Sequence, residues 1–231
     1  MKALRDLGVT NSSEGGISAR FRGARFDVFL RLIKDWKRPI RILDVGGTEL
    51  FWERRNSLEG GDFRITTVNL EATPSRSPYL TSIEGDATNL AKFDASEFDL
   101  VFSNSVIEHL FNEESQMAMG HEITRFGLPY WVQTPNYWFP VEPHFHLLGW
   151  QWYPRSVRIG LLRRIRCGMR GPVKDRGEAA ALVDEVRLMS ERDLRAAMPG
   201  ARIYREKFGP LTKSLVAISG FENLDSVVKT V

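Results

Sequence analysis

Cysteine is almost absent from this sequence, and long apolar runs are missing altogether. Cys167 is the single cysteine among 231 residues, which excludes an internal disulfide and any cysteine-based zinc site and fits a reducing, cytoplasmic setting. No stretch approaches the ~18 apolar residues that a membrane-spanning helix needs. Residues 1–6 are followed by no apolar run, so we expect no signal peptide.

Charge is nearly balanced overall but not locally. The net charge is +3, yet residues 155–176 contain eight basic residues and one acidic residue. Apolar residues are interleaved with these arginines, which favours an amphipathic helix. Three interpretations stay open: a solvated surface helix, a site for an anionic substrate such as a phospho-sugar or glycolipid, and a peripheral contact with an acidic membrane surface.

The apolar pattern predicts an α/β protein. Residues 17–36 indicate an amphipathic helix that ends before Arg38-Pro39. Short apolar runs then alternate with possible helices, which is typical of βαβ units in a parallel sheet. The predicted strands are Ile40–Val45, Ile65–Leu70, Leu80–Ile83, Phe98–Ser103 and Tyr130–Thr134.

The last part of the chain predicts a helix and a hairpin. Ser190–Met198 reads as a helix with Ser190 as N-cap and Asp193 three residues on, a variant of the capping box. Ala201–Phe208 and Ser214–Ser219 follow as two strands joined by a short turn. We therefore expect one antiparallel strand at the edge of an otherwise parallel sheet.

The first predicted strand ends in an acid and two glycines, Asp44-Val-Gly46-Gly47-Thr48. Glycines let the backbone turn tightly and come close to a ligand. A dinucleotide-binding loop would carry further glycines, but Thr48 and Phe51 stand at those positions. Asp44 suits a ligand that carries an ammonium group, whereas the alternative is an ordinary strand–turn–helix.

Three further strand ends carry polar residues in the same order along the chain. Asn69 or Glu71 could accept hydrogen bonds from a ribose diol after the second strand. Asp86 after the third strand could accept from an adenine amino group, or could simply form an Asx-turn. After the fourth strand, Phe98–Leu110 delivers polar groups to the carboxyl edge of the sheet, with Glu108 and His109 expected in the first turn of a helix.

Taken together, these motifs resemble the class I S-adenosylmethionine-dependent methyltransferases, particularly their type 11 group. Residues 38–134 and 188–219 carry the resemblance. It implies a Rossmann-like seven-stranded, mostly parallel sheet with helices on both faces and an antiparallel last strand. It also implies S-adenosyl-L-methionine as cofactor, with these binding residues: Asp44, Gly46, Gly47, Thr48, Asn69, Leu70, Glu71, Asp86, Ala87, Ser103 and Asn104.

We expect a single domain over residues 1–231, in four parts. These are an N-terminal helical segment, a cofactor-binding half, a substrate lid or insertion, and a C-terminal helix with the hairpin, over residues 1–37, 38–134, 135–189 and 190–231. The lid is predicted because its sequence does not alternate cleanly and is rich in Pro, Trp and Arg.

The predicted acceptor side is aromatic and contains histidines. Four of the six tryptophans fall within residues 130–153, where they could bind a ring or a lipid or could form a small satellite core. If residues 140–146 are extended, Glu142, His144 and His146 point the same way. The candidate catalytic residues are His144, preferred because it follows Pro143, then His109, His146 and Glu108.

Two uses of these side chains are considered. One is general base catalysis by a histidine. The other is a divalent metal that lowers the pKa of a hydroxyl; some quinone O-methyltransferases that resemble this chain carry Glu-x-x-Glu-His here and bind a metal. Ser105 stands where the first Glu would be, so a metal-free base is favoured and no metal ligand is assigned.

The leading hypothesis is methyl transfer to an oxygen of a small molecule, a glycan, or a lipid or quinone precursor. A second is a cofactor-binding module with little or no turnover, which the shortened glycine loop allows. A third is an RNA methyltransferase that uses the basic patch; nucleic acid is disfavoured because Ser103-Asn104-Ser105 replaces the Asn/Asp-Pro-Pro-aromatic loop of base-amine methyltransferases. The sequence does not define an oligomeric state.

Overall fold

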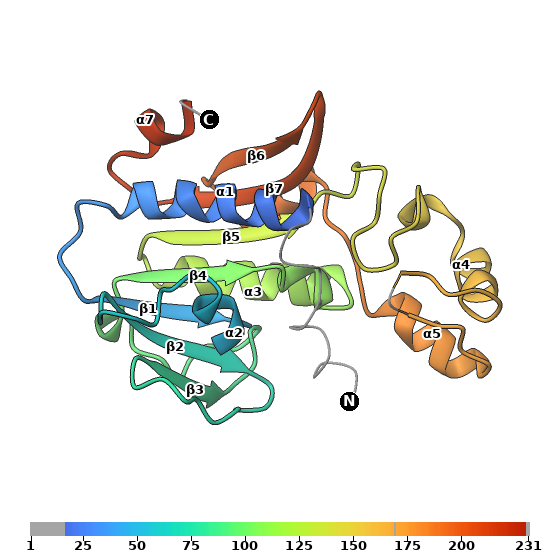
Figure 1. Cartoon of the computed structure of the whole chain (residues 1–231), viewed down its shortest axis with the longest axis horizontal. Helices are drawn as coiled ribbons and strands as arrows, with labels where there is room; N and C mark the ends of the chain where they lie inside the picture. Colours follow the sequence, from blue (N-terminus) through green and yellow to red (C-terminus); the bar gives the residue numbers. More distant parts are fainter. Residues whose placement is uncertain (1–16, 169, 230–231) are drawn as a thin grey trace. The chain divides into compact units, whose positions relative to one another are not determined.

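The computed structural model describes residues 17–168 and 170–229 (Figure 1). Within them, seven strands form one sheet in the order β3-β2-β1-β4-β5-β7-β6. The β1–β2, β1–β4 and β2–β3 pairs are parallel. The strands are β1 Ile40–Val45, β2 Phe63–Asn69, β3 Leu80–Glu84, β4 Leu100–Asn104, β5 Tyr130–Pro135, β6 Arg202–Phe208 and β7 Leu211–Ser219. All seven predicted runs therefore form strands.

The last strand, β7, lies inside the sheet rather than at its edge. Tyr130 at the start of β5 is hydrogen-bonded to Ser219 at the end of β7, while the Asn136 N–H just after β5 donates to the carbonyl of Lys213 near the start of β7. These two strands are therefore antiparallel. The expectation of an antiparallel edge strand is thus wrong in position: β6 takes the edge, because the short turn at Gly209-Pro210 lets β7 fold back between β5 and β6.

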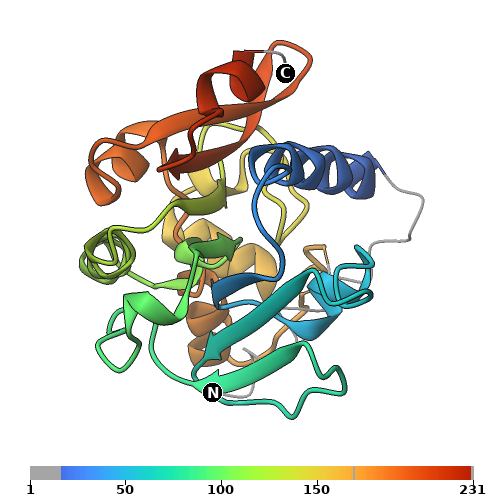
Figure 2. The same ribbon diagram turned by 90° about the vertical axis from the view of Figure 1, so that its left-hand side faces the viewer.

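The helices accompany the sheet on both faces. In Figure 2, α1 lies on one face of the strands and the C-terminal end of α3 on the other. No helix in the described ranges is long and apolar enough to cross a membrane. The α-helices are α1 Ile17–Leu32, α2 Glu49–Glu53, α3 Glu113–Arg125, α4 Arg155–Leu162, α5 Arg176–Asp184, α6 Glu191–Ala197 and α7 Leu224–Lys229, and the 3₁₀ turns are η2 Ala95–Glu97, η3 Ile107–His109 and η4 Trp150–Trp152.

Local sequence signals explain where several helices begin and end. Ser190 caps α6, and Asp193 accepts from the Ser190 N–H in return, so the predicted capping box is present. Helix α1 ends four residues earlier than expected, because Trp36 N–H bonds three residues back to Ile33 and tightens the chain into a turn. The N-terminal residues 1–16 of the predicted helical segment lie outside the described residues.

The described chain forms two compact units, each with its own core. The first contains residues 17–104, 121–132 and 218–229. Its core is aromatic: Phe29 packs on Phe102 and Trp131, with ring centroids 4.9 and 5.6 Å apart. Phe29, Phe102 and Trp131 are at most 1% exposed, and each contributes about 2–3 kcal/mol by burial.

The second unit contains residues 105–120 and 133–217, with residue 169 not described. Much of it is the segment predicted as a lid, which folds around a small apolar core of its own. Phe145 stacks on Trp150 at a centroid distance of 4.2 Å, and the remaining members are Ile159, Leu162, Cys167, Ala179 and Val183. Part of the aromatic density in residues 130–153 is therefore a satellite core, as one of the two interpretations held.

Candidate functional site

The first strand delivers a buried acid to the carboxyl edge of the sheet. Asp44 is 1% exposed. Its Oδ2 accepts a 2.7 Å hydrogen bond from the indole N–H of Trp52, while its Oδ1 has no hydrogen-bond partner among the described residues. Burial raises the pKa of Asp44 to about 7, against smaller lowering effects of Trp52 and Arg55. Asp44 is thus a desolvated acceptor with one oxygen still to be satisfied.

Both positions of the loop favour glycine, one because of its backbone conformation and the other because of a close neighbour. Gly46 has φ +78°, in the left-handed region, and its N–H donates to the carbonyl of Val68 at 2.8 Å. A Cβ at Gly47 would lie 1.6 Å from Asp44 Oδ2, so the carboxylate occupies the space that a side chain would take. Thr48 caps α2 by accepting from the N–H of Phe51.

The other strand ends carry polar groups that are mostly engaged within the protein. Asn69 donates from Nδ2 to the Gly47 carbonyl at 2.8 Å, and so ties β2 to the glycine loop. The buried Ser103 hydroxyl donates to the Val45 carbonyl at 2.9 Å. Asp86 accepts from both the N–H and the hydroxyl of Thr88, each at 2.8 Å. The Asx-turn interpretation of Asp86 is therefore confirmed.

The remaining predicted cofactor contacts differ in exposure. Leu70 is 57% exposed; Glu71 is also exposed and Ala87 is half-buried. Asn104 accepts a 3.3 Å hydrogen bond from Arg25 of α1, a buried arginine that is not among the predicted site residues. The sequence signal that could have identified Arg25 is a basic residue within the apolar face of a predicted helix.

These residues fit S-adenosylmethionine by their chemistry. The unsatisfied Asp44 Oδ1 is an acceptor for an ammonium group, and the Gly46-Gly47 turn leaves no side chain over the loop. Asn69 and Asp86 stand at the next two strand ends in the expected order. When bound, the cofactor would supply an electrophilic methyl group.

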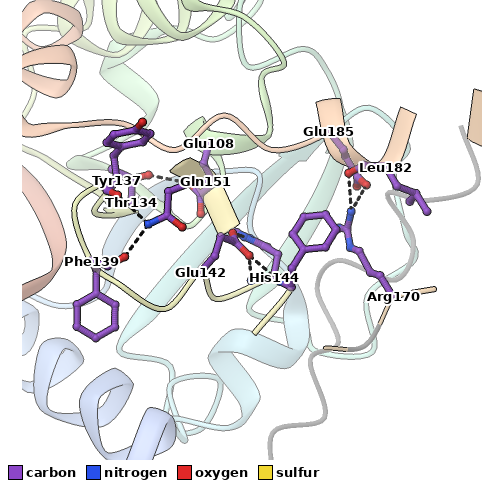
Figure 3. A network of polar contacts seen from close by, with 11 residues as sticks. Glu108, Thr134, Tyr137, Phe139, Glu142, His144, Gln151, Arg170, Leu182 and Glu185 are labelled. Atoms are coloured by element: carbon purple, nitrogen blue, oxygen red, sulfur yellow. Dashed lines mark hydrogen bonds and ion pairs between the residues drawn. The ribbon is translucent and has the colours of Figure 1, made fainter. Parts of the chain in front are cut away.

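The second unit contains a cluster that includes two of the predicted catalytic residues, Glu108 and His144 (Figure 3). Glu108 is fully buried and accepts from the Thr134 hydroxyl at 3.0 Å. His144 Nδ1 lies 2.5 Å from Glu142 Oε1. Glu142 Oε2 also accepts from the N–H groups of His144 and Phe145, at 2.7 and 2.6 Å. The rings of His109 and His144 meet edge to face with centroids 4.9 Å apart.

Electrostatics divide these groups into different roles. Burial raises the pKa of Glu108 to about 7, although the His144 charge acts against it. Burial lowers the pKa of His109 to about 3, and the charges of His144 and Arg170 lower it further. Burial also disfavours the charged form of His144, but the hydrogen bond and charge of Glu142 outweigh it and raise the pKa of His144. His109 is therefore held neutral, whereas His144 readily takes a proton.

Two local predictions about this cluster are wrong. Glu108 and His109 lie in the 3₁₀ turn η3, because α3 begins only at Glu113. Residues 142–147 form a turn rather than an extended segment: the His146 N–H donates to the Glu142 carbonyl at 2.9 Å. The turn leaves His146 exposed, with φ +51°, outside the cluster that contains His144.

The cluster also has the donor set of a metal site. One ligand atom each from Glu108, His109 and His144 lie within 4.8 Å of one another. Glu108 Oε1 and His109 Nδ1 are buried and have no hydrogen-bond partner among the described residues. A carboxylate and two imidazoles suit zinc and other divalent ions. The geometry thus supports keeping the metal alternative beside the metal-free base.

A cavity of about 300 Å³ lies beside this cluster, within the second unit. Glu142 belongs to both, since it lines the cavity and holds His144. Aromatic side chains and two arginines supply much of the rest of the wall: Phe111, Tyr137, Phe145, Trp150, Arg158 and Arg187. Tyr137, Phe145 and Trp150 come from the predicted aromatic region, whereas Gln151, which also lines the cavity, had no sequence signal.

A family model described as a methyltransferase domain matches residues 54–127. This range carries the ends of β2, β3 and β4 and continues through Glu108 and His109. The match to a methyltransferase domain agrees with the resemblance to the class I methyltransferases. The family uses S-adenosylmethionine as its methyl donor, and the sheet order with an antiparallel β7 is the fold that the resemblance implied.

Several known proteins are similar to this chain. An uncharacterized protein of Mycobacterium tuberculosis (strain H37Rv) is 27% identical over 139 residues, covering 51% of this chain and 46% of the relative. The chain thus spans about half the length of the curated relatives it matches. A SAM-dependent methyltransferase from Aquifex aeolicus is 11% identical with a TM-score of 0.49, covering 94% and 97% of the two chains. PigF with SAH is 12% identical with a TM-score of 0.44, covering 87% and 64%.

Proposed function

We propose that this protein is a methyltransferase that transfers the methyl group of S-adenosylmethionine to a hydroxyl oxygen of a small molecule, a glycan, or a lipid or quinone precursor. The observation that carries the proposal is the Glu142–His144 pair beside an aromatic cavity. Aromatic walls suit a ring-bearing acceptor, and an imidazole oriented by a carboxylate is suited to accept its hydroxyl proton. Residues 135–189 would serve as the cover of the acceptor.

In the proposed reaction, S-adenosylmethionine held at Asp44, Gly46 and Gly47 would supply an electrophilic methyl group to the acceptor oxygen. Glu142 fixes the His144 ring through Nδ1, which leaves Nε2 to receive the hydroxyl proton. The carboxylate then stabilises the imidazolium that forms. After the methylated product leaves, His144 passes the proton to water. Alignment and exclusion of water supply much of the acceleration.

His144 is preferred over His109 as the base. The pKa of His109 is lowered to about 3, chiefly by burial, so its ring is a weak proton acceptor. Glu142 raises the pKa of His144 instead. His109 would then contribute by its edge-to-face contact with the His144 ring, and Glu108 would contribute a second polar side chain beside these two rings. His146 is exposed and has no role in this scheme.

The test is a screen of acceptors with labelled cofactor, followed by His144→Ala with the product identified. We expect the transfer rate to fall by roughly 100-fold or more with cofactor affinity unchanged. His121→Ala is the matched control, because the His121 side chain is 79% exposed on α3 and should leave the rate unchanged. A near-normal transfer rate in His144→Ala would show that His144 is not the base. An equal loss of rate in both variants would indicate damage to the fold.

The two other hypotheses remain separable from this one. A binding module would bind S-adenosylmethionine by calorimetry and transfer nothing to any fraction of an extract. An RNA methyltransferase would bind RNA with an affinity that falls steeply with salt. Neither outcome is expected, because the cavity is lined in part by aromatic residues and all of its lining residues come from the second unit.

Exposed aromatics favour an additional property, peripheral contact with an anionic membrane surface. Trp138 and Trp152 are 63% and 44% exposed, with Leu148 at 67%, and the two indole rings lie 6.5 Å apart. Of the predicted basic stretch 155–176, the helix α4 covers only Arg155–Leu162. Interfacial tryptophans beside arginines are typical of membrane-surface segments. We expect co-sedimentation with phosphatidylglycerol-containing vesicles but not with pure phosphatidylcholine vesicles, lost in a Trp138→Ala/Trp152→Ala double variant.

A further inference from the structure

Two polar atoms in the wall of the cavity have no hydrogen-bond partner. Arg158 Nε and Gln151 Oε1 are both buried and unpaired among the described residues, and both side chains line the cavity. A buried polar group without a partner is energetically unfavourable, and more so when it is charged. A ligand that pairs with both atoms would offset that cost.

Arg158 lacks a bonded carboxylate because its neighbour has taken the nearby one. Arg155 binds Asp184 through two hydrogen bonds of 2.7 and 2.5 Å. Glu142, the other acid in the cavity wall, is engaged by His144 and by two backbone N–H groups. Arg158 is therefore a partly buried arginine in the cavity wall that makes no bond to an anionic side chain among the described residues. Guanidinium groups in this position bind carboxylates and phosphates well.

Gln151, in the cavity wall, has a fixed orientation that leaves its amide oxygen without a partner among the described residues. Its amide nitrogen donates to the carbonyls of Tyr137 and Phe139, at 2.9 and 2.7 Å (Figure 3). With both donors used by carbonyl oxygens, Oε1 must be the free end of the amide. This oxygen can accept a hydrogen bond from a hydroxyl group. It is therefore complementary to a second polar group on the same ligand.

The remaining wall favours a ring. Trp150, Phe145 and Tyr137 supply apolar and aromatic surface, and Arg187 is held by hydrogen bonds to Gln116 and Glu113. About 300 Å³ is at the lower end of the volumes of small-molecule sites. We propose that this cavity binds a hydroxylated ring that carries a carboxylate or phosphate, with the anion on Arg158 and a hydroxyl on Gln151. Its assignment as the methyl acceptor rests on the proposed function.

Calorimetric titration of the full chain, without S-adenosylmethionine, tests the binding site apart from any methyl transfer. The probes are two matched pairs: 4-hydroxybenzoate with 4-hydroxybenzamide, and glucose 6-phosphate with glucose. We expect at least one anionic probe to bind about tenfold or more tightly than its neutral partner. The pair that shows the preference tells a carboxylate ligand from a phosphate ligand. Equal affinities within both pairs, or no binding at millimolar concentration, would overturn the proposal.

Arg158→Met keeps the apolar stem and removes the charge, and should abolish that preference while leaving the neutral partner's affinity within about twofold. Arg164→Met is the control: Arg164 is exposed and bonded to the Gly160 carbonyl, so the preference should persist. Retention of the preference in Arg158→Met, or its loss in Arg164→Met, would refute the site. Anion-selective binding without any methyl transfer would uphold the site and reject the proposed function.

Discussion

Replacing Asp44 by asparagine should separate stability from cofactor binding. Burial raises the pKa of Asp44 from 3.8 to about 7, so the folded protein binds a proton more tightly than the unfolded chain does. The free energy of unfolding therefore falls as the pH rises from about 4 to about 7 and is flat above that. At about 1.4 kcal/mol per pH unit, the Asp44 contribution falls by about 3 kcal/mol between pH 5 and pH 8.

Asp44→Asn removes this dependence, because the amide does not titrate. Asparagine retains an oxygen that can accept the Trp52 N–H, so the variant should be more stable than the wild type at pH 8 and closer to it at pH 5. Its affinity for S-adenosylmethionine should fall at least about tenfold, since the free Oδ1 loses its charge. Urea denaturation at both pH values, without cofactor, measures the first effect, and calorimetry measures the second.

Asp99→Asn is the matched control with the opposite sign. The hydrogen bond and charge of Arg41 lower the pKa of Asp99, so its stabilising contribution is present at neutral pH and lost as the pH falls through the lowered value. This variant should be less stable than the wild type at pH 8. If Asp44→Asn lost stability equally at pH 5 and pH 8, the account of a desolvated carboxylate would be refuted.

Three further outcomes follow from the same contacts. Gly47→Ala should lower cofactor affinity and melting temperature together, because its Cβ would displace the Asp44 carboxylate; calorimetry and thermal melts measure both. Gly23→Ala in α1, where a Cβ meets nothing within 4 Å, should instead stabilise the protein by about 1 kcal/mol, and a loss would contradict the helical surroundings of that position. Glu142→Gln should lower the pKa of His144, seen by histidine NMR titration, and slow methyl transfer at constant cofactor affinity; an unmoved titration would exclude the pairing.

The strands and the capped helix could be predicted because local sequence specifies them. Ser190 and Asp193 specify the start of α6 through their own side chains, and Ile40–Val45 is apolar enough to be a buried strand in nearly any arrangement. The position of β7 could not be predicted in this way. The hairpin specifies that β6 and β7 pair with each other. Only packing against β5 decides which of the two lies in the interior of the sheet.

The site was predictable where backbone geometry controls it and not where tertiary contacts do. Asp44 and the glycines follow directly from the strand–turn pattern. The partner of Asp44, Trp52, and the orientation of His144 by Glu142 depend on contacts that no spacing encodes. The prediction about His146 failed because it assumed an extended segment, whereas Glu142 accepts three hydrogen bonds from the next three N–H groups of the chain and bends it.

The place of β7 next to β5 also has a consequence for protein synthesis. In the sheet, β5 lies between β4 and β7. During synthesis β5 is complete about 75 residues before β7 begins. During that interval one edge of β5 has unpaired backbone groups next to the apolar residues Trp131 and Val132. Such an edge invites pairing with other chains. Expression at low temperature or with chaperones should therefore raise the yield of the intact chain, whereas truncation before residue 211 should favour aggregation.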